Sequence, residues 1–451
     1  MYCIPPILKE IAAKFSHVGK KVFLVGGAVR DMLRGIKAHD FDLATDALPE
    51  EVSSVFKRVF PTGITHGTVT VYFKGQQLEV TTFRTEIGYS DGRHPDMIHF
   101  TSSIEEDLSR RDFTMNAMAL NILNGTLIDP FHGAADIQHN IIRCVGDPVE
   151  RFNEDGLRPL RAVRFAAQLN FSIDSATLEA IPACIASVKK VSQERIRDEI
   201  DKIIDSQHPS TAFLLMEKTT LLALILPELA QCRGIEQKGF HRFDVLDHVL
   251  LACDYAAQHG YPHTVRLAAL LHDSGKPLVR EEQNGVWTFY NHEQKSAALA
   301  ESLLNRLRYP HTVMHEVTHL IKNHMFHYEE SWTDAAVRRF IIRVGVEHLT
   351  ALYQLRFADA FATAKQHIPV DYLAPLTTHV EKILAESHCF SLKDLAINGN
   401  DLMQLGIEPG PNMGIILNEL LETVISDPAL NTFEQLKTIA CRLKQRKFNA
   451  L

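Results

Sequence analysis

The alternation of apolar and polar residues along the 451-residue chain changes character near residue 140. Before that point, apolar and polar residues alternate over 68–73 and 77–83, on either side of a Lys-Gly-Gln turn, which predicts a β-hairpin. Beyond it, apolar residues recur at helical spacing over 160–169, 245–257 and 415–424. We therefore expect an α+β protein with a small mixed head and an almost wholly helical remainder.

Composition excludes some classes of protein. The chain is 45% hydrophobic and 23% charged, which is ordinary for a globular protein with several domains. No apolar run reaches the roughly 20 residues of a membrane span, the N-terminus lacks a signal-peptide pattern, and the seven cysteines are dispersed. We therefore expect a cytoplasmic protein with reduced thiols and no membrane partner. Because the net charge is −8, any contact with nucleic acid must come from a local basic strip.

Two carboxylates stand two residues apart, Asp40 and Asp42 in the run His-Asp-Phe-Asp-Leu. Side chains at this spacing share one face of a strand, about 7 Å apart along the chain. Anions this close favour a bound cation, and Mg²⁺ prefers oxygen ligands. Glu79, among apolar neighbours in the second hairpin strand, is a candidate third ligand, although a glutamate facing solvent explains it about as well.

A double glycine precedes these carboxylates. Gly26 and Gly27 end a predicted strand over 21–25 and begin a predicted helix over 27–34, so the backbone can approach a phosphate closely. Arg30, one turn into this helix, is a candidate contact for a triphosphate, with an ion pair to Asp31 as the weaker alternative. A phosphate cradle beside metal-binding carboxylates is suited to nucleotidyl transfer.

Asp155, Arg158 and Arg161 follow one another at helical spacing. Cytosine and adenine each present an amino donor beside a ring-nitrogen acceptor, whereas uracil and guanine present the reverse order. Asp155 accepting and Arg158 donating would therefore hold C or A and reject U or G. The alternative is an ion pair within a helix, worth about 0.3–0.5 kcal/mol. Gly156 and Pro159 predict that the helix itself begins near Leu157.

These motifs resemble those of class II tRNA nucleotidyltransferases, the CCA-adding enzymes of the poly(A) polymerase head-domain group. The matching stretches are 24–31, 40–45, 110–117, 154–165 and 192–197. The resemblance implies a polymerase-β-like palm over 1–138, a helical neck over 139–230, an HD domain over 231–366 and a tRNA-binding tail over 367–451. It also implies tRNA, ATP and CTP as partners and Mg²⁺ in the head. The implied head residues are the metal ligands Asp40 and Asp42, the nucleotide and ribose contacts Arg111 and Asp112, and the base-selecting pair Asp155 and Arg158. Asn116 and Arg161 are further candidate nucleotide-binding residues.

A second set of candidate ligands lies in the middle of the chain. His272 and Asp273 are adjacent, His248 precedes them by 24 residues, and Asp359 follows much later. Histidine and aspartate together bind divalent metals, and this pattern resembles the HD phosphohydrolase domain. His292, His324 and His327 are spaced as ligands of a second metal would be. A metal site here, of unknown metal identity, would hydrolyse a phosphomonoester or cyclic phosphate at a damaged tRNA end; a helical scaffold that only grips tRNA is the alternative.

Three functional classes remain open from sequence. The first is CCA addition, with a specialised A-adding enzyme as its nearest variant; an uninterrupted loop over 84–96 favours A addition. The second is a regulatory protein uridylyltransferase, which the preference of Asp155 and Arg158 for C or A disfavours. The third is a non-catalytic RNA binder, disfavoured because unpaired acids would repel phosphate. The sequence does not indicate an oligomeric state.

Overall fold

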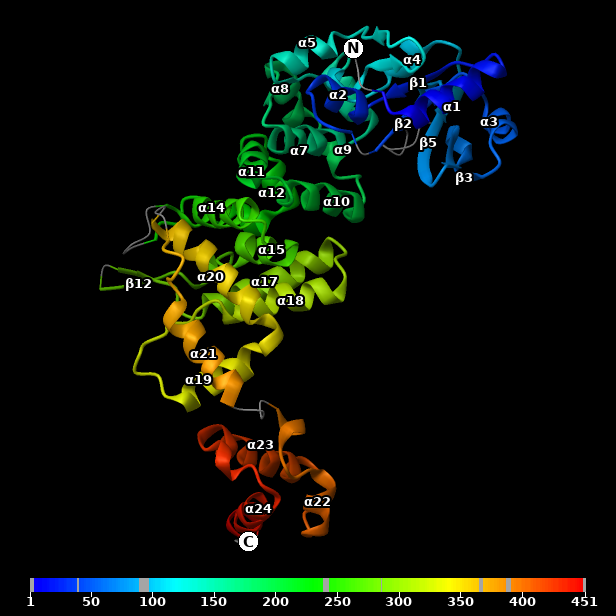
Figure 1. Ribbon diagram of the computed structural model, residues 1–451. Coiled ribbons are helices and arrows are strands. Elements are labelled where there is room, and N and C mark those ends of the chain that lie inside the picture. The colour runs from blue at the N-terminus through cyan, green and yellow to red at the C-terminus, as the bar shows by residue number, and fades with distance from the viewer. Residues whose placement is uncertain are drawn as a thin grey trace. The chain divides into compact units, whose positions relative to one another are not determined.

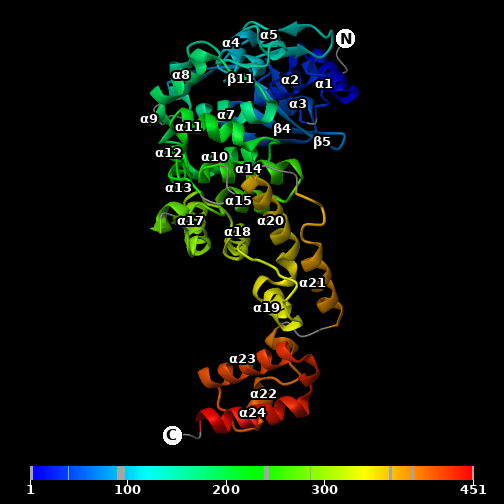
Figure 2. The same ribbon diagram turned by 90° about the vertical axis from the view of Figure 1, so that its left-hand side faces the viewer.

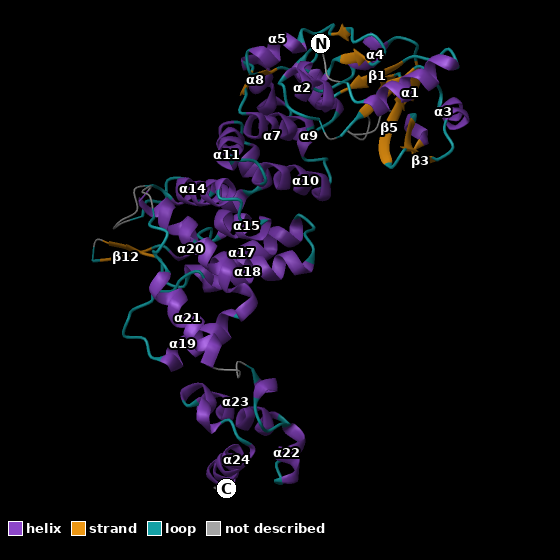
Figure 3. Cartoon of the chain, viewed as in Figure 1, coloured by secondary structure: helices purple, strands orange, loops and turns teal. Residues whose placement is uncertain are grey.

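The computed structural model describes residues 4–38, 40–88, 97–237, 243–284, 286–364, 368–386 and 391–448. Residues 89–96, in the loop that favours A addition, lie outside this range, as does His39. The chain forms two compact units, Met1–Gln231 with Leu303–Tyr309, and Cys232–Ser302 with Pro310–Leu451. Figure 1 colours the chain by residue number, and Figure 3 shows that most strands belong to the first unit. The four-part division stays a prediction.

Within the described residues, the first unit combines a seven-stranded sheet and two two-stranded sheets, β6 with β7 and β10 with β11, with helices. Its helices are α1 (Pro6–His17), α2 (Gly27–Leu33), α3 (Pro49–Val55), α4 (Ile104–Ser109), α5 (Gly133–Gln138), α6 (Pro148–Glu154), α7 (Arg158–Leu169), α8 (Ser175–Ala183), α9 (Ile185–Val188), α10 (Gln193–Ile204), α11 (Pro209–Lys218), α12 (Leu221–Ile225) and α13 (Pro227–Ala230). Its strands are β1 (Val22–Val25), β2 (Asp42–Thr45), β3 (Val59–Gly63), β4 (Thr68–Phe73), β5 (Gln76–Thr82), β6 (Arg84–Ile87), β7 (Met97–Phe100), β8 (Ala119–Asn121), β9 (Leu127–Ile128), β10 (Ile141–Ile142) and β11 (Ser172–Ile173).

A seven-stranded sheet of order β3-β4-β5-β2-β1-β8-β9 forms the head. The predicted hairpin is confirmed as β4 and β5, and the predicted strand–glycine–helix segment as β1 followed by α2. Strand β2 pairs antiparallel with β1 and parallel with β5. Apolar residues of this sheet and of helix α4 build a buried core around Phe23, Ala44, Phe83 and Leu108. The polar start of β2 therefore lies in the middle of the sheet, beside β1 and β5.

The helical segment after the head is interrupted at Asp155. Helix α6 ends at Glu154, and α7 begins at Arg158, so the prediction that a helix starts near Leu157 is confirmed. Gly156 is required in this break because a Cβ there would lie 2.2 Å from the carbonyl oxygen of Ser187. Behind α7, the buried guanidinium of Arg164 pairs with the carboxylate of Glu199 on α10. The close approach at Gly156 fixes the break before α7, and the ion pair holds the middle of α7 against α10.

The second unit is almost wholly helical. Its elements are α14 (Val245–Gln258), α15 (His263–Leu271), α16 (Lys276–Val279), β12 (Glu281–Gln283), β13 (Val286–Thr288), α17 (His292–Arg306, which continues into the first unit), α18 (His311–Asn323), α19 (Asp334–Val344), α20 (Leu349–Ala364), α21 (Ala374–Glu386), α22 (Gly399–Gln404), α23 (Pro411–Ser426) and α24 (Phe433–Phe448). Apolar faces of α22, α23 and α24 share one buried cluster, and Figure 2 shows these helices side by side. Among the described residues, no helix combines the length and apolar character required to cross a membrane.

Candidate functional sites

A pocket of about 450 Å³ opens over the centre of the head sheet. Asp42 and Glu79 are register partners in the parallel pair β2 and β5, so their side chains leave the same face. Both line the pocket, and the exposed Asp40 just precedes β2. The predicted grouping of the three acids is supported by electrostatics, because the pKa of the Asp42 carboxyl is raised by loss of water contact and by the charges of Asp40 and Glu79. Such repulsion is relieved when a cation binds.

The double glycine forms the rim of this pocket. Gly26 has a φ of 69°, in the left-handed region, and its missing Cβ would lie 3.3 Å from Arg111 Nη1 and 3.6 Å from Asp42 Oδ2. A side chain at this position would therefore intrude between a cation and a carboxylate. Glycine here keeps the backbone close to both, as a phosphate-binding turn requires.

Arg30 lines the pocket and also forms the ion pair with Asp31 that was the alternative, while its contact with a triphosphate stays a prediction. Its Nε donates to Asp31 Oδ1 at 3.0 Å, and its Nη1 donates to Asn116 Oδ1 at 3.0 Å. The guanidinium lines the pocket, 5.4 Å from the ring centroid of Phe165. The ion pair with Asp31 therefore orients Arg30 within the pocket and does not remove it from the site.

The pocket is also lined by Arg84, Arg110 and Arg111. Two acids that the sequence analysis did not identify hold these arginines in place. Asp107, fully buried on α4, accepts hydrogen bonds from Arg110 at 2.8 Å and from Arg111 at 3.3 Å. Glu86 on β6 bridges Arg84 and Arg110. The Nε of Arg111 is buried and has no hydrogen-bond partner within the described residues. The acidic first turn of α4, just before Arg110, was the sequence signal that could have predicted Asp107 as a partner of these arginines.

Asp112 joins the head to helix α7. Its Oδ2 accepts a hydrogen bond from Arg161 Nε at 2.8 Å, and its Oδ1 accepts one from Asn116 Nδ2 at 3.3 Å. Burial alone would raise the pKa of Asp112, but the charge and hydrogen bonds of Arg161 hold it at about 2. This carboxylate is therefore ionised at neutral pH and fixes Arg161 at the pocket wall.

Asp155 and Arg158 both line the pocket, but they do not share a helix. Asp155 Oδ1 accepts a hydrogen bond from the backbone amide of Leu157 at 3.0 Å, and Asp155 Oδ2 accepts one from Arg195 Nη2 at 2.8 Å. Arg158 donates to Glu154 at 2.6 Å and to the Arg110 carbonyl at 3.0 Å. The expected helical spacing of Asp155 is therefore wrong, and the competing ion pair between Asp155 and Arg158 does not form. Different partners therefore hold the Asp155 carboxylate, an acceptor, and the Arg158 guanidinium, a donor, at the same pocket.

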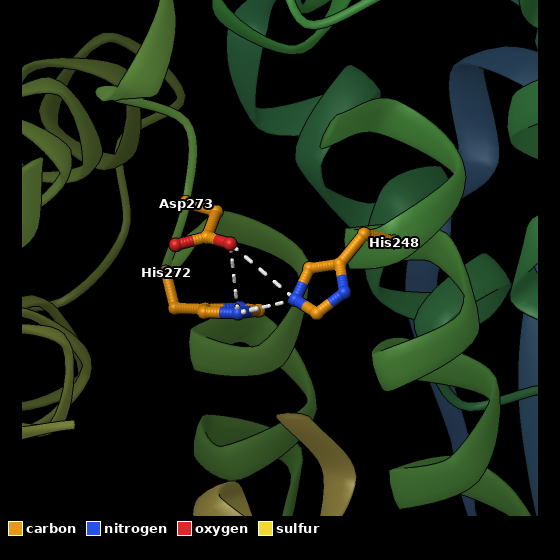
Figure 4. Close-up of side chains that lie close together, drawn as sticks. All are labelled: His248, His272 and Asp273. Atoms are coloured by element: carbon orange, nitrogen blue, oxygen red, sulfur yellow. Dashed lines mark hydrogen bonds and ion pairs between the residues drawn. The ribbon is translucent and has the colours of Figure 1, made fainter. Parts of the chain in front are cut away.

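A buried cluster of histidines and aspartates lies in the second unit. His248 Nε2 is 3.1 Å from His272 Nε2, 3.3 Å from Asp273 Oδ2 and 3.2 Å from Asp359 Oδ1. Figure 4 shows His248 on one helix and His272 with Asp273 at the end of another, with the three side chains directed toward one another. The structure thus brings together the four residues predicted for the first metal.

The other oxygen of Asp273 faces two further histidines. Asp273 Oδ1 lies 3.1 Å from His292 Nε2 and 3.8 Å from His324 Nε2. Within the described residues, only these two overlapping groups bring three potential ligand atoms within 4.8 Å of one another. Burial lowers the pKa of His324 to about 3, so this imidazole is neutral and available as a ligand at neutral pH. The expectation for His327 is wrong: its side chain is 81% exposed and pairs with Glu329.

The tail places its Asn-Gly turn at the start of α22. The side chain of Asn398 accepts hydrogen bonds from the Asn400 and Asp401 amides, and Asp401 accepts from the Asn398 amide. These amides are therefore occupied within the chain. The contact of the tail with tRNA stays a prediction.

The sheet, glycine turn and grouped carboxylates define the head of a nucleotidyltransferase. Residues 22–143 match the family described as the poly A polymerase head domain, and 170–232 match the one described as a probable RNA and SrmB-binding site of polymerase A. Residues 279–440 match the one described as a putative tRNA nucleotidyltransferase domain 2. CCA-adding enzymes of Levilactobacillus brevis and Lactiplantibacillus plantarum are 34% and 36% identical, over 93% and 96% of this chain and 92% and 94% of theirs.

Solved structures agree with these matches. The CCA-adding enzyme of Bacillus stearothermophilus in complex with CTP is 29% identical, with a TM-score of 0.76 over 99% of this chain and 100% of that one. A Thermotoga maritima CCA-adding enzyme, 19% identical with a TM-score of 0.57 over 98% of this chain and 96% of that one, shares the fold. The chain belongs to the class II CCA-adding enzyme family.

Proposed function

We propose that the head pocket transfers C, C and A from CTP and ATP to the 3′ end of tRNA. The observation that carries this proposal is the convergence on one pocket of Asp42 and Glu79, from β2 and β5, and of Asp155 and Arg158, from the break before α7. One pair suits metal-assisted transfer and the other suits base selection. The names of the similar enzymes, including one whose structure contains CTP, support the same activity.

Asp40, Asp42 and Glu79 would hold Mg²⁺ in this reaction. An all-oxygen donor set matches a hard divalent cation. Burial and the charges of Asp40 and Glu79 raise the pKa of Asp42 although Arg111 opposes the shift, so a cation bound among these acids would relieve their repulsion. When bound, Mg²⁺ supplies positive charge for the attacking hydroxyl and the pyrophosphate leaving group. Arg111 and Arg30, on two walls of the pocket, bind and orient the triphosphate.

Base selection rests on the fixed orientation of two side chains. Arg195 and the Leu157 amide hold the Asp155 carboxylate, while Glu154 holds the Arg158 guanidinium. The carboxylate accepts the exocyclic amino group of C or A, and the guanidinium donates to the neighbouring ring nitrogen. Uracil and guanine would instead set a carbonyl against the carboxylate and an N–H against the guanidinium, and these unfavourable contacts disfavour both bases.

Incubation with tRNA lacking CCA and each labelled nucleotide tests the proposal. Incorporation of C followed by A supports CCA addition. A alone indicates the specialised A-adding variant, and labelled protein indicates a uridylyltransferase. The double substitution Asp40→Ala/Asp42→Ala should abolish incorporation, whereas Glu50→Ala, on the exposed side of α3, should not. Full activity of the double variant would refute the proposal.

We infer a second activity, metal-dependent hydrolysis of phosphate esters, from the buried histidine–aspartate cluster. Its imidazole and carboxylate donors fit a divalent transition metal, and Asp273 presents one oxygen to each of the two groups. Such a bound metal supplies an activated water. The variant His272→Ala/Asp273→Ala should lose both bound metal and phosphate release, while the surface variant His311→Ala should keep both. Unchanged phosphate release in the double variant would refute this activity.

A further inference from the structure

The ring of Phe165, on α7, forms part of the wall of the head pocket although the residue is only 5% exposed. Among the described residues that line this pocket, it is the one aromatic side chain. Three guanidinium groups lie close to the ring: the Cζ atoms of Arg30 and Arg161 are each 5.4 Å from its centroid, and that of Arg164 is 3.8 Å away. A guanidinium within about 6 Å of an aromatic centroid is attracted to the ring. Phe165 is therefore a common contact of three cations.

The three arginines divide into one that lies in the interior and two that face the pocket. Arg164 is buried, pairs with the carboxylate of Glu199 on α10, and does not belong to the described lining of the pocket. Arg30 from α2 and Arg161 from α7 both line the pocket. The ring of Phe165 thus connects an arginine that is fixed in the core with two that a bound ligand can reach.

Arg30 and Arg161 are also joined by a chain of hydrogen bonds. Arg30 Nη1 donates to Asn116 Oδ1 at 3.0 Å, and Asn116 Nδ2 donates to Asp112 Oδ1 at 3.3 Å. The other oxygen of Asp112 accepts a hydrogen bond from Arg161 Nε at 2.8 Å. These hydrogen bonds use some of the N–H donors of the two guanidiniums. Because a cation–π contact uses none, the ring of Phe165 restrains both groups and leaves their remaining donors for a ligand.

One of these remaining donors lies at the glycine turn. Arg30 Nη2 is 3.5 Å from the point where a Cβ on Gly27 would stand. Ordering a long arginine side chain when a ligand binds is costly, because many rotamers are lost. A ring that holds the guanidinium beside the phosphate-binding turn before the nucleotide arrives reduces this cost.

We propose that Phe165 is a positioning residue for nucleotide binding, whose ring holds Arg30 and Arg161 in place for the sugar and triphosphate of the incoming nucleotide. The proposal rests on the proposed nucleotidyl transfer and deepens it. CTP and ATP share these parts, so the ring affects the binding of both to the same extent. The choice of base stays with Asp155 and Arg158.

Single-nucleotide addition to tRNA lacking CCA and to tRNA ending in CC tests this role. Phe165→Leu removes the ring and keeps an apolar side chain. It should raise KM for both CTP and ATP roughly 10-fold and leave kcat within about threefold of wild type, since the loss of cation–π contacts in a desolvated site has this magnitude. The ratio of kcat/KM for CTP over UTP should not change. Phe165→Tyr, which keeps the ring, should retain the wild-type KM.

Phe213→Leu is the matched control, because Phe213 is fully buried on α11, which packs against α7, and lies outside the pocket lining. A wild-type KM in Phe165→Leu overturns the proposal. An equal rise of KM in Phe213→Leu, or a loss of discrimination against UTP in Phe165→Leu, indicates general damage to α7 and also overturns it. Thermal unfolding shows whether each variant is folded at the assay temperature. If Phe165→Leu is not, Phe165→Met takes its place, since methionine also lacks a ring and adapts to irregular space.

A double-mutant cycle shows whether the ring acts through the arginines. In the Arg30→Ala background, Phe165→Leu should raise KM by less than about threefold, because one of the two guanidiniums that the ring positions is already missing. An undiminished rise of KM in that background would overturn the proposal.

Calorimetric binding of CTP keeps the positioning role distinct from the transfer reaction. Weaker binding by Phe165→Leu than by wild type, together with no incorporation by wild type, supports the positioning role and refutes the transfer. Incorporation by wild type, together with equal binding of CTP by both proteins, supports the transfer and overturns the positioning role.

Discussion

Replacing Asp155 by asparagine changes one of the two oxygens of this side chain into an amide nitrogen. In the structure, these oxygens accept hydrogen bonds from the Leu157 amide at 3.0 Å and from Arg195 at 2.8 Å. Asparagine can keep one of these bonds and remains nearly the same size. The ion pair that is lost is partly exposed, so its loss should cost no more than about 1 kcal/mol of stability. The variant should therefore fold and keep the pocket.

The effect on nucleotide choice should be larger than the effect on stability. The carboxylate would lose a charge-assisted hydrogen bond to the amino group of C or A, which is worth about 1.5–3 kcal/mol. This corresponds to a decrease of roughly 10- to 100-fold in kcat/KM for both CTP and ATP. The new amide N–H can donate to the O4 carbonyl of uracil, so discrimination against UTP should also decrease.

Single-nucleotide addition to tRNA lacking CCA and to tRNA ending in CC measures both reactions. Asp147→Asn is the matched control, because Asp147 caps the start of α6, the helix that ends just before Asp155, and lies outside the pocket lining. If Asp155→Asn leaves kcat/KM for CTP and ATP within twofold of wild type, the base-selection argument is wrong. An equal loss in Asp147→Asn would point to general damage to α6.

Two further predictions concern stability. Gly156→Ala should lower the free energy of unfolding by about 1–3 kcal/mol in urea titration, because its Cβ would lie 2.2 Å from the Ser187 carbonyl oxygen. The control is Gly414→Ala, which has open space around it and should show no loss of stability. An unchanged free energy of unfolding in Gly156→Ala would contradict the close approach. The pKa of Asp112 is lowered from 3.8 to about 2, so its ionised form contributes about 2 kcal/mol that is fully present above pH 4 and lost as pH falls toward 2. The stability difference between wild type and Asp112→Asn should therefore shrink over that range, and a constant difference would refute the assigned shift.

Local patterns predicted much of the fold of the head. Alternation and a glycine-containing turn identified β4 and β5, since both signals come from adjacent residues. The parallel neighbour of β5 is β2, and no local pattern specifies such a pairing. The hairpin of β12 and β13 was missed because its first strand, Glu281–Gln283, is wholly polar and exposed.

Candidate site residues could be predicted where the type of residue alone indicates its chemistry, as histidine and aspartate indicate metal binding. Adjacent His272 and Asp273 indicated a metal site, and the structure brings their expected partners to them. The helical spacing of His324 and His327 gave a wrong prediction because α18 ends at Asn323. His327 therefore does not share a helix face with His324. Arg195 could not be predicted as a partner of Asp155, because that contact depends on how α10 packs beside the helix break.

The parallel register of β2 and β5 has a consequence for biosynthesis. Asp42 and Glu79 become neighbours only after the intervening strands have folded back and β5 has docked against β2. Because loop closure must precede such non-local pairing, we expect the two acids to be brought together late in the folding of the head. A chain truncated before β5 would lack Glu79 and therefore this pair of carboxylates.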